Sequence, residues 1–150
     1  MVFAVCAYAH RWVGDYYHVV NPDAFYFEAW AKGLIGPGLV GSGVAWPLAG
    51  LSRVVGYSAA SAIIPIALGL LTMAVLYLGV RRLYSPRVAL GAAVCWAIAM
   101  PSHWHCLAGN VDRDCLHLLI ATVGLMSLAL YAQDGRTPWV WVFAGAVLVL

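Results

Sequence analysis

Apolar runs without charge recur along the chain and are separated by short polar or charged segments. A helix that crosses the hydrocarbon core of a bilayer needs about 20 predominantly apolar residues. The pattern therefore predicts an all-α, polytopic membrane helical bundle. Its expected parts are the tail of a truncated first span (1–9), an external loop (10–57), three spans (58–80, 88–104 and 115–132) and the start of a truncated last span (138–150).

The expected external loop contains a short helix near its beginning. Asn21 is a favoured N-cap residue, and Pro22 suits the first helical position. Over residues 22–34, aromatic residues occupy one side, while Glu28 and Lys32 lie four apart on the other. The helix is amphipathic and too short to span, so we expect it to lie on the membrane surface.

Residues 33–57 leave two alternatives open. They are long enough to cross a bilayer, but they contain seven glycines and two prolines, with Arg53 near their end. This density of helix breakers favours a segment that follows the membrane surface. If the segment instead spans, the residues before it lie on the opposite side of the membrane.

The distribution of charge sets the sidedness. Residues 81–87 hold three arginines and no acid, which by the positive-inside bias predicts a cytoplasmic turn. Asp112 and Asp114 then lie outside, one span later. Asp23 is on that external side only if residues 33–57 do not cross the membrane.

Composition agrees with the membrane class. Hydrophobic residues make up 64% of the chain and charged residues 9%, with a mean hydropathy of +0.87. The net charge of +2 is small and no basic stripe is present, so we expect lipid and no nucleic acid as a partner. The four cysteines form no C-x-x-C pair, which argues against a zinc ribbon or a redox motif.

Four of the six acidic residues lie in two short segments, 21–28 and 108–114. Ionised side chains near a bilayer are costly and usually have a function. On a common external face, Asp23, Asp112 and Asp114 would converge on one cation. Carboxylate oxygens are the ligands that Mg²⁺ and Mn²⁺ prefer, so a divalent-cation site is the hypothesis.

These segments resemble two motifs of one enzyme family. Residues 23–27 (DAFYF), with Ala31 and Lys32 further on, resemble the first external-loop motif of the catalytic subunit of oligosaccharyltransferases. Residues 108–114 (AGNVDRD) are similar to the Gly-x-x-Asp-x-Asp element of that family's second external loop. The family belongs to the GT-C glycosyltransferases, and the resemblance covers about residues 10–145.

The resemblance implies a GT-C fold and a function. The fragment would belong to an enzyme that moves a glycan from a polyprenyl-(pyro)phosphate carrier to an acceptor asparagine of a polypeptide. Asp23 would act on the acceptor and bind Mn²⁺ or Mg²⁺ together with Asp112 and Asp114. His105 and His117 would support the site. The active site would face outward, in the plasma membrane of a prokaryote.

The chain departs from the family pattern in several places. His105 and Cys106 stand where Arg-Thr is usual, and Ala29 or Trp30 stands where many members have an arginine. The later external-loop glutamate and the Trp-Trp-Asp-Tyr-Gly acceptor motif are absent from these 150 residues. We therefore expect half of an active site, inactive by itself.

Other interpretations remain open from the residues alone. Asp112 or Asp114 would serve equally well as the N-cap of a helix that begins at Cys115. His103 and His105 suit an interfacial belt beside Trp104. One alternative function is another GT-C enzyme that uses a polyprenyl-phosphate sugar. A second is a transporter fragment with Gly/Pro-broken segments at its binding site. A third is an inert or accessory membrane protein, in which the three carboxylates would not converge.

Overall fold

The computed structural model describes residues 44–99 and 113–149. These residues form five α-helices: α3 (Ala45–Val55), α4 (Tyr57–Leu83), α5 (Pro86–Ile98), α7 (Arg113–Asp134) and α8 (Thr137–Val149). Within this part of the chain, α4 and α7 are long and apolar enough to cross a membrane. The predicted all-α helical bundle is confirmed for the described residues.

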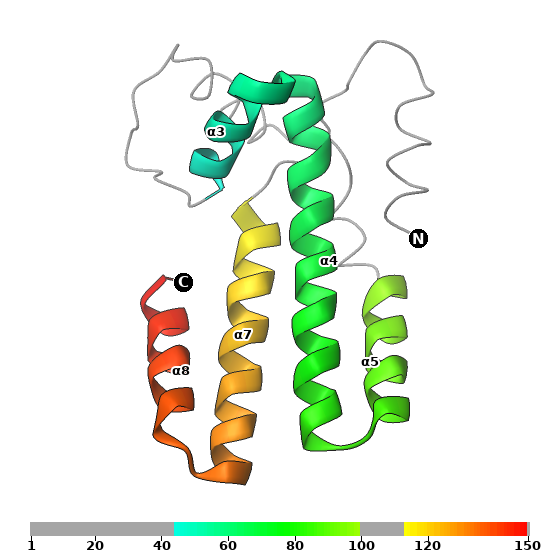
Figure 1. The fold of residues 1–150 in the computed structure, drawn as a ribbon, viewed down its shortest axis with the longest axis vertical. Coiled ribbons are helices and arrows are strands. Elements are labelled where there is room, and N and C mark those ends of the chain that lie inside the picture. Colours follow the sequence, from blue (N-terminus) through cyan, green and yellow to red (C-terminus); the bar gives the residue numbers. More distant parts are fainter. Residues whose placement is uncertain (1–43, 100–112, 150) are drawn as a thin grey trace.

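Four helices lie side by side in the order α5, α4, α7, α8, and α3 lies against one end of α4 (Figure 1). The connected pairs α4–α5 and α7–α8 run antiparallel because each is joined by a short turn. Both turns lie at the same end of the bundle, and α3 and the start of α7 lie at the other (Figure 1). The two turns are therefore separated from α3 and the start of α7 by the length of the bundle.

Helix α4 is the central element, in contact with α3, α5 and α7. It is apolar on all sides, as expected of a helix that faces neighbouring helices on one side and lipid on the other. Its hydroxyl groups are satisfied locally: Thr72 Oγ1 donates to the Leu68 carbonyl at 2.8 Å. Pro65 lies inside the helix and is buried, which a membrane helix tolerates where neighbours pack against it.

Two turns have clear local causes. Ser85 caps α5, because its hydroxyl accepts a bond from the Val88 N–H at 3.4 Å, and Pro86 occupies the first helical position. Gly135, between α7 and α8, has a φ of 62°, a left-handed conformation that favours glycine. The chain therefore reverses direction within a few residues at both places.

Small residues bring the helices together. A Cβ atom on Gly79 of α4 would lie 2.7 Å from Met126 Sδ of α7. A Cβ on Gly124 would lie 3.3 Å from the Ala146 Cβ of α8. Close approach at small residues is how membrane helices associate, because lipid provides no hydrophobic drive between them.

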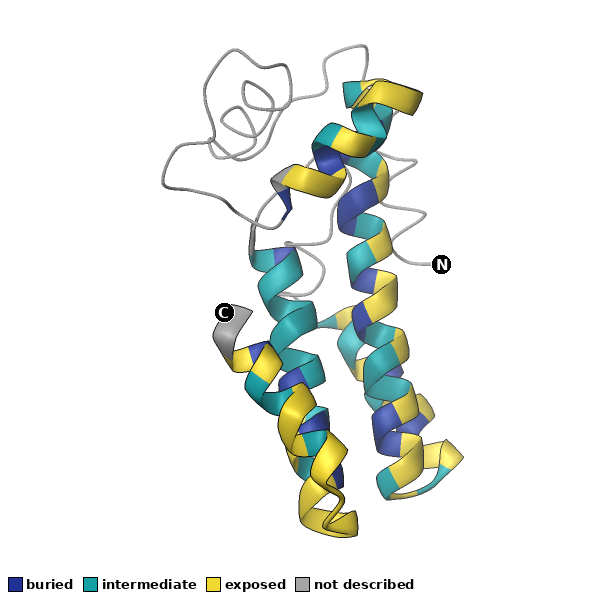
Figure 2. Cartoon of the chain, turned by 60° about the vertical axis from the view of Figure 1, so that its left-hand side comes forward, coloured by how far each residue is buried: buried dark blue, intermediate teal, exposed yellow. Residues whose placement is uncertain are grey.

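Much of the described surface is apolar. Large hydrophobic side chains are exposed on every described helix, among them Leu78 (60%), Ile98 (70%), Leu125 (62%) and Trp141 (73%). Buried positions are confined to the places where helices meet, and the outer sides are exposed (Figure 2). So much exposed apolar surface would be a liability in water and is normal for surfaces that face lipid.

Helices α4 and α7 contain two of the three expected complete spans. Residues 58–80 lie within α4, and 115–132 lie within α7. Helix α5 is shorter than the expected span 88–104, because Ala99 has an extended conformation (ψ 130°) and Pro101 follows closely. The expected segments 1–9 and 22–34 lie outside the described residues.

Candidate functional site

The start of α7 is held in place by a small apolar core. Cys115 is fully buried there, in one cluster with Val44, the N-cap of α3, with Leu48 of α3, and with Ala60 and Ile64 of α4. A buried cysteine outside a disulfide packs as a small hydrophobic residue. The cluster therefore fixes the first turn of α7 against residues 44–64, which include the end of the expected external loop (10–57).

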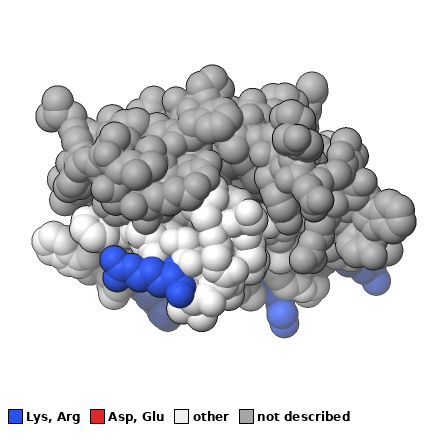
Figure 3. Space-filling view, turned by 90° about the horizontal axis from the view of Figure 1, so that it is seen from above, with Lys and Arg blue, Asp and Glu red and all other residues white. Residues whose placement is uncertain are grey.

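Helix α3 shows two different faces. Val44 and Leu48 are fully buried on the inner side, while Trp46 is 66% exposed and Arg53 is exposed on the outer side. The arginine in the last turn suits the negative end of the helix dipole. Seen from above, the described surface shows basic side chains and no acidic one (Figure 3). An 11-residue helix of this kind is too short to cross a bilayer.

Asp114 and His117 come from the first two turns of α7. They are three residues apart, so both lie on one side of the helix. The Asp114 Oδ1 atom is 3.8 Å from His117 Nδ1, and both side chains are partly exposed, at 46% and 39%. The pair thus presents a carboxylate and an imidazole at the end of the bundle where α3 lies.

The position of Asp114 bears on its alternative role as an N-cap. Helix α7 begins at Arg113, two residues before the expected start at Cys115, and Asp114 lies within its first turn. Asp114 is therefore not the N-cap of this helix. Its charge still favours the helix, because an acid in the first turn complements the positive end of the dipole.

The structure describes two of the five residues expected at the metal site. Asp114 and His117 are described, whereas Asp23, Asp112 and His105 lie outside the described residues. Among residues 44–99 and 113–149, no three His, Cys, Asp or Glu side chains form a cluster that could hold a metal. The carboxylate oxygen of Asp114 and the imidazole nitrogen of His117 are both atoms that can bind a divalent ion such as Mn²⁺. Two ligands alone do not make a metal site.

The opposite end of the bundle is basic. Arg82 of α4 lies 3.7 Å from Asp134 of α7, measured from Nη2 to Oδ2. The Arg82 guanidinium also lies 5.4 Å from the centre of the Trp139 ring of α8, within cation–π range. These contacts connect α4, α7 and α8. The sequence does not predict them, because no local pattern relates Arg82 to Asp134, which is 52 positions further along the chain.

Comparison with known proteins decides the class of this molecule. The family model for dolichyl-phosphate-mannose-protein mannosyltransferases matches residues 41–150, more than half of the chain. The chain belongs to this mannosyltransferase family. Neither the curated proteins nor the solved structures contain a significant match to it.

Membership of the mannosyltransferase family confirms the predicted GT-C glycosyltransferase class and its location in a membrane. It does not specifically support oligosaccharyltransferase, the family suggested by the two acidic motifs. The alternative of another GT-C enzyme with a polyprenyl-phosphate sugar donor agrees better with the match. The family description names a dolichyl-phosphate-linked sugar donor, so the mannosyltransferase family shares with oligosaccharyltransferases the use of a polyprenyl-linked donor.

The mannosyltransferase match begins at residue 41 and so covers all five described helices, but not residues 21–28. Of the expected site residues, His105, Asp112, Asp114 and His117 fall inside the matched range. Asp23 falls outside it. The role expected of Asp23 therefore depends on the sequence motif alone.

Proposed function

We propose that the chain is part of a membrane enzyme that transfers mannose from dolichyl-phosphate-mannose to a protein acceptor. The single observation that carries this proposal is the family match over residues 41–150. The geometry is compatible with it, because α7 presents Asp114 and His117 at the end of the bundle opposite the two turns, at which Arg81, Arg82, Arg87 and Arg136 lie. The proposed membrane is the plasma membrane of a prokaryote, with the reaction on its external face.

The reaction needs few groups from the protein. The acceptor oxygen or nitrogen attacks the anomeric carbon of mannose, and its proton goes to a carboxylate that acts as general base. The bond between that carbon and the phosphate oxygen breaks, and dolichyl phosphate leaves with the electron pair. Asp23 is the proposed base, because its segment resembles the acceptor-activating motif of a related family.

Asp112 and Asp114 are proposed to bind a divalent cation, Mn²⁺ or Mg²⁺, together with Asp23. Such an ion supplies electrostatic stabilisation to an anionic leaving group. His117 is proposed to orient Asp114 through the 3.8 Å contact seen in α7, and His105 to support the site from the preceding loop. A histidine that orients a metal-binding carboxylate typically changes metal affinity without being a ligand.

The experiment is a transfer assay with the full-length enzyme in membranes. Dolichyl-phosphate-mannose labelled in the sugar is supplied with a mixture of acceptor peptides. We expect labelled peptide from the native enzyme and none from Asp23→Asn or Asp112→Asn. Glu28→Gln is the matched control, because it neutralises an acid of the first segment that is expected to face solvent. Equal activity in all variants would remove the carboxylates from the mechanism.

A second candidate is transfer of an oligosaccharide from a pyrophosphate carrier to asparagine. The specific observation in its favour is residues 108–114 (AGNVDRD), which resemble the oligosaccharyltransferase element. The same membranes are supplied with a polyprenyl-pyrophosphate oligosaccharide in place of the mannosyl donor. Glycosylated peptide from this donor alone would decide for the second candidate and against the first.

A further inference from the structure

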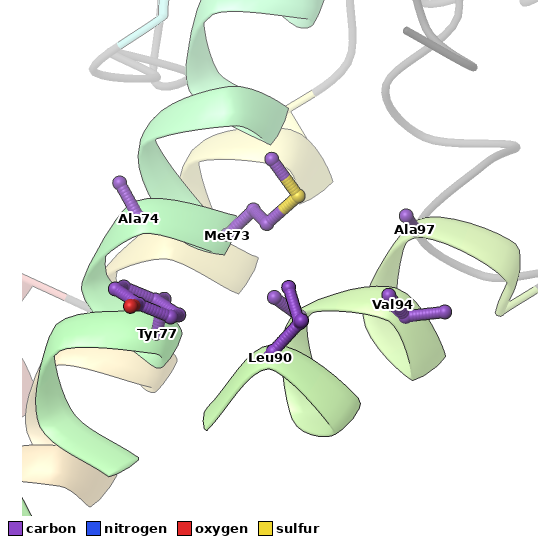
Figure 4. Close-up of a pocket in the computed structure, with 7 residues that line it drawn as sticks. Met73, Ala74, Tyr77, Leu90, Val94 and Ala97 are labelled. Carbon is purple, nitrogen blue, oxygen red and sulfur yellow. The ribbon is translucent and has the colours of Figure 1, made fainter. Parts of the chain in front are cut away.

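An apolar groove of about 350 Å³ lies between α4 and α5. Met73 and Tyr77 extend into it from α4, and Leu90 rises from α5 (Figure 4). The lining is almost wholly apolar and is completed by small residues. The full set is Met73, Ala74, Tyr77, Leu90, Ala93, Val94 and Ala97. A groove of this size and chemistry holds a length of hydrocarbon chain, and its side chains offer a single hydroxyl group, that of Tyr77, which is too little to orient a sugar.

Both walls of the groove lead to an arginine. On α4, Met73, Tyr77 and Arg81 are spaced four residues apart and share one face. Since a helix rises about 1.5 Å per residue, Arg81 lies about 6 Å beyond Tyr77 along the axis. On α5, Arg87 precedes Leu90 by three residues, on the same face and at the same end.

These two arginines differ from their neighbour Arg82. Arg82 faces Asp134 and Trp139, on the side of α7 and α8. Arg81 and Arg87 are exposed, and neither has an ion-pair partner among residues 44–99 and 113–149. The mouth of the groove therefore carries two positive charges that no described acid balances.

We propose that this groove is a binding site for an anionic phospholipid. One acyl chain lies between α4 and α5, and the headgroup phosphate lies between Arg81 and Arg87. The turn that joins the two helices emerges where the headgroups begin, so the guanidinium groups are at phosphate depth. Basic pockets between membrane helices at the cytoplasmic side bind anionic headgroups in this way, and arginine pairs well with phosphate oxygens.

Anionic phospholipid fits the groove better than the lipid-linked sugar donor. The arginines lie at the end of the bundle opposite Asp114 and His117, where sugar transfer is proposed to occur. A donor held at Arg81 would have its sugar on the wrong side of the membrane. The lipid site does not depend on the transferase activity and can be tested without it.

The test uses the purified full-length protein, released from detergent micelles in a native mass spectrometer. Phosphatidylglycerol or phosphatidylcholine with identical acyl chains is added in increasing amounts, and retained lipid is counted. We expect stronger retention of phosphatidylglycerol, reduced about fivefold by Arg81→Gln and by Arg87→Gln. Arg136→Gln is the matched control, because it removes one charge at the same end but beside α8. It should leave retention unchanged.

A second pair of variants tests the apolar part of the site. Ala74→Trp fills the groove from an exposed position of α4, so the fold tolerates it. We expect it to lower phosphatidylglycerol retention severalfold, whereas Leu125→Trp, on the exposed face of α7, should not.

Four results would overturn the lipid site. Equal retention of the two lipids would show that the phosphate is not recognised. Equal loss with Arg81→Gln and Arg136→Gln would reduce the effect to overall charge. If dolichyl phosphate displaced the retained lipid at a lower concentration than added phosphatidylglycerol does, the groove would belong to the sugar donor. Retention unchanged by Ala74→Trp would show that the groove is not occupied by lipid, for instance because another helix of the chain covers it.

Discussion

At the residue scale, glycines shape the described structure more than charges do. Gly56 is the single residue between α3 and α4, with φ 83° and ψ 157°. This conformation is essentially restricted to glycine. Its N–H donates to the Ser52 carbonyl at 3.0 Å, so the bend is also held by a hydrogen bond. Gly56 therefore allows α3 to turn back over α4 and reach the start of α7.

Replacing this glycine should disturb the apolar cluster that joins α3, α4 and the start of α7. Gly56→Ala should destabilise the protein by about 1–3 kcal/mol, because an L side chain strains this backbone conformation. Gly91→Ala is the control, since an added Cβ there meets open space and Gly91 lies inside helix α5. Thermal unfolding in detergent, followed by circular dichroism, measures both. A Gly56→Ala protein as stable as the native one would show that the bend does not need glycine.

The Asp114–His117 pair gives a second prediction at this scale. If His117 orients a metal-binding carboxylate, His117→Ala should weaken Mn²⁺ binding by about 10–100-fold. Asp114→Asn should weaken it further. Asp134→Asn, at the other end of the same helix, is the control. Titration calorimetry of the full-length protein with Mn²⁺ measures the dissociation constants, and unaltered binding in both α7 variants would exclude the pair from the site.

At the element scale, the contact between α4 and α7 is the central interface of the bundle. Gly79 is buried in it against Met126, and Arg82, one turn further along α4, contacts Asp134. Asp134 is partly exposed, so this ion pair contributes little by itself. The close approach of the two helices at Gly79 is therefore the stronger constraint on their separation.

Enlarging Gly79 should push these helices apart. Gly79→Val should destabilise the bundle by about 1–3 kcal/mol through overpacking against Met126. Because methionine is flexible, Met126→Ala should recover part of the loss, with a coupling of about 1 kcal/mol in a double-mutant cycle. Unfolding in mixed detergent micelles gives the four stabilities. Strict additivity would mean that the two residues do not contact each other.

At the scale of the whole molecule, the two ends of the bundle should face opposite sides of a membrane. Arg81, Arg82, Arg87 and Arg136 lie at the end with the two turns, and α3 and Asp114 lie at the other. By the positive-inside bias, the end with the turns is cytoplasmic. The expected external site then depends on residues 33–57 remaining outside the bilayer.

Cysteine labelling tests this arrangement. The four native cysteines are replaced by alanine, and single cysteines are introduced at Glu28, Arg53 and Ser85. In intact cells, an impermeant maleimide should label the positions of Glu28 and Arg53 but not that of Ser85. Labelling at Arg53 without labelling at Glu28 would place a span between them. Asp23 would then lie on the cytoplasmic side, and a site shared with Asp114 would be impossible.

Much of this architecture follows from the sequence alone. The apolar runs determine α4 and α7, because only a helix satisfies its own backbone within lipid. Ser85, Pro86 and Gly135 determine where neighbouring helices end and begin, because they are local features of capping and φ. The acidic segments indicated a GT-C enzyme, but they pointed to oligosaccharyltransferase, whereas the family match over residues 41–150 is to the mannosyltransferases.

Only the tertiary structure decided which side chains meet. The burial of Cys115 beside Leu48, the approach of Gly79 to Met126 and the groove between α4 and α5 depend on how apolar helices pack. Helices that are apolar on every side carry no periodic signal for the partner that each face will choose. The physical reason is that lipid and protein are equally apolar neighbours, so close steric fit between particular residues determines the arrangement.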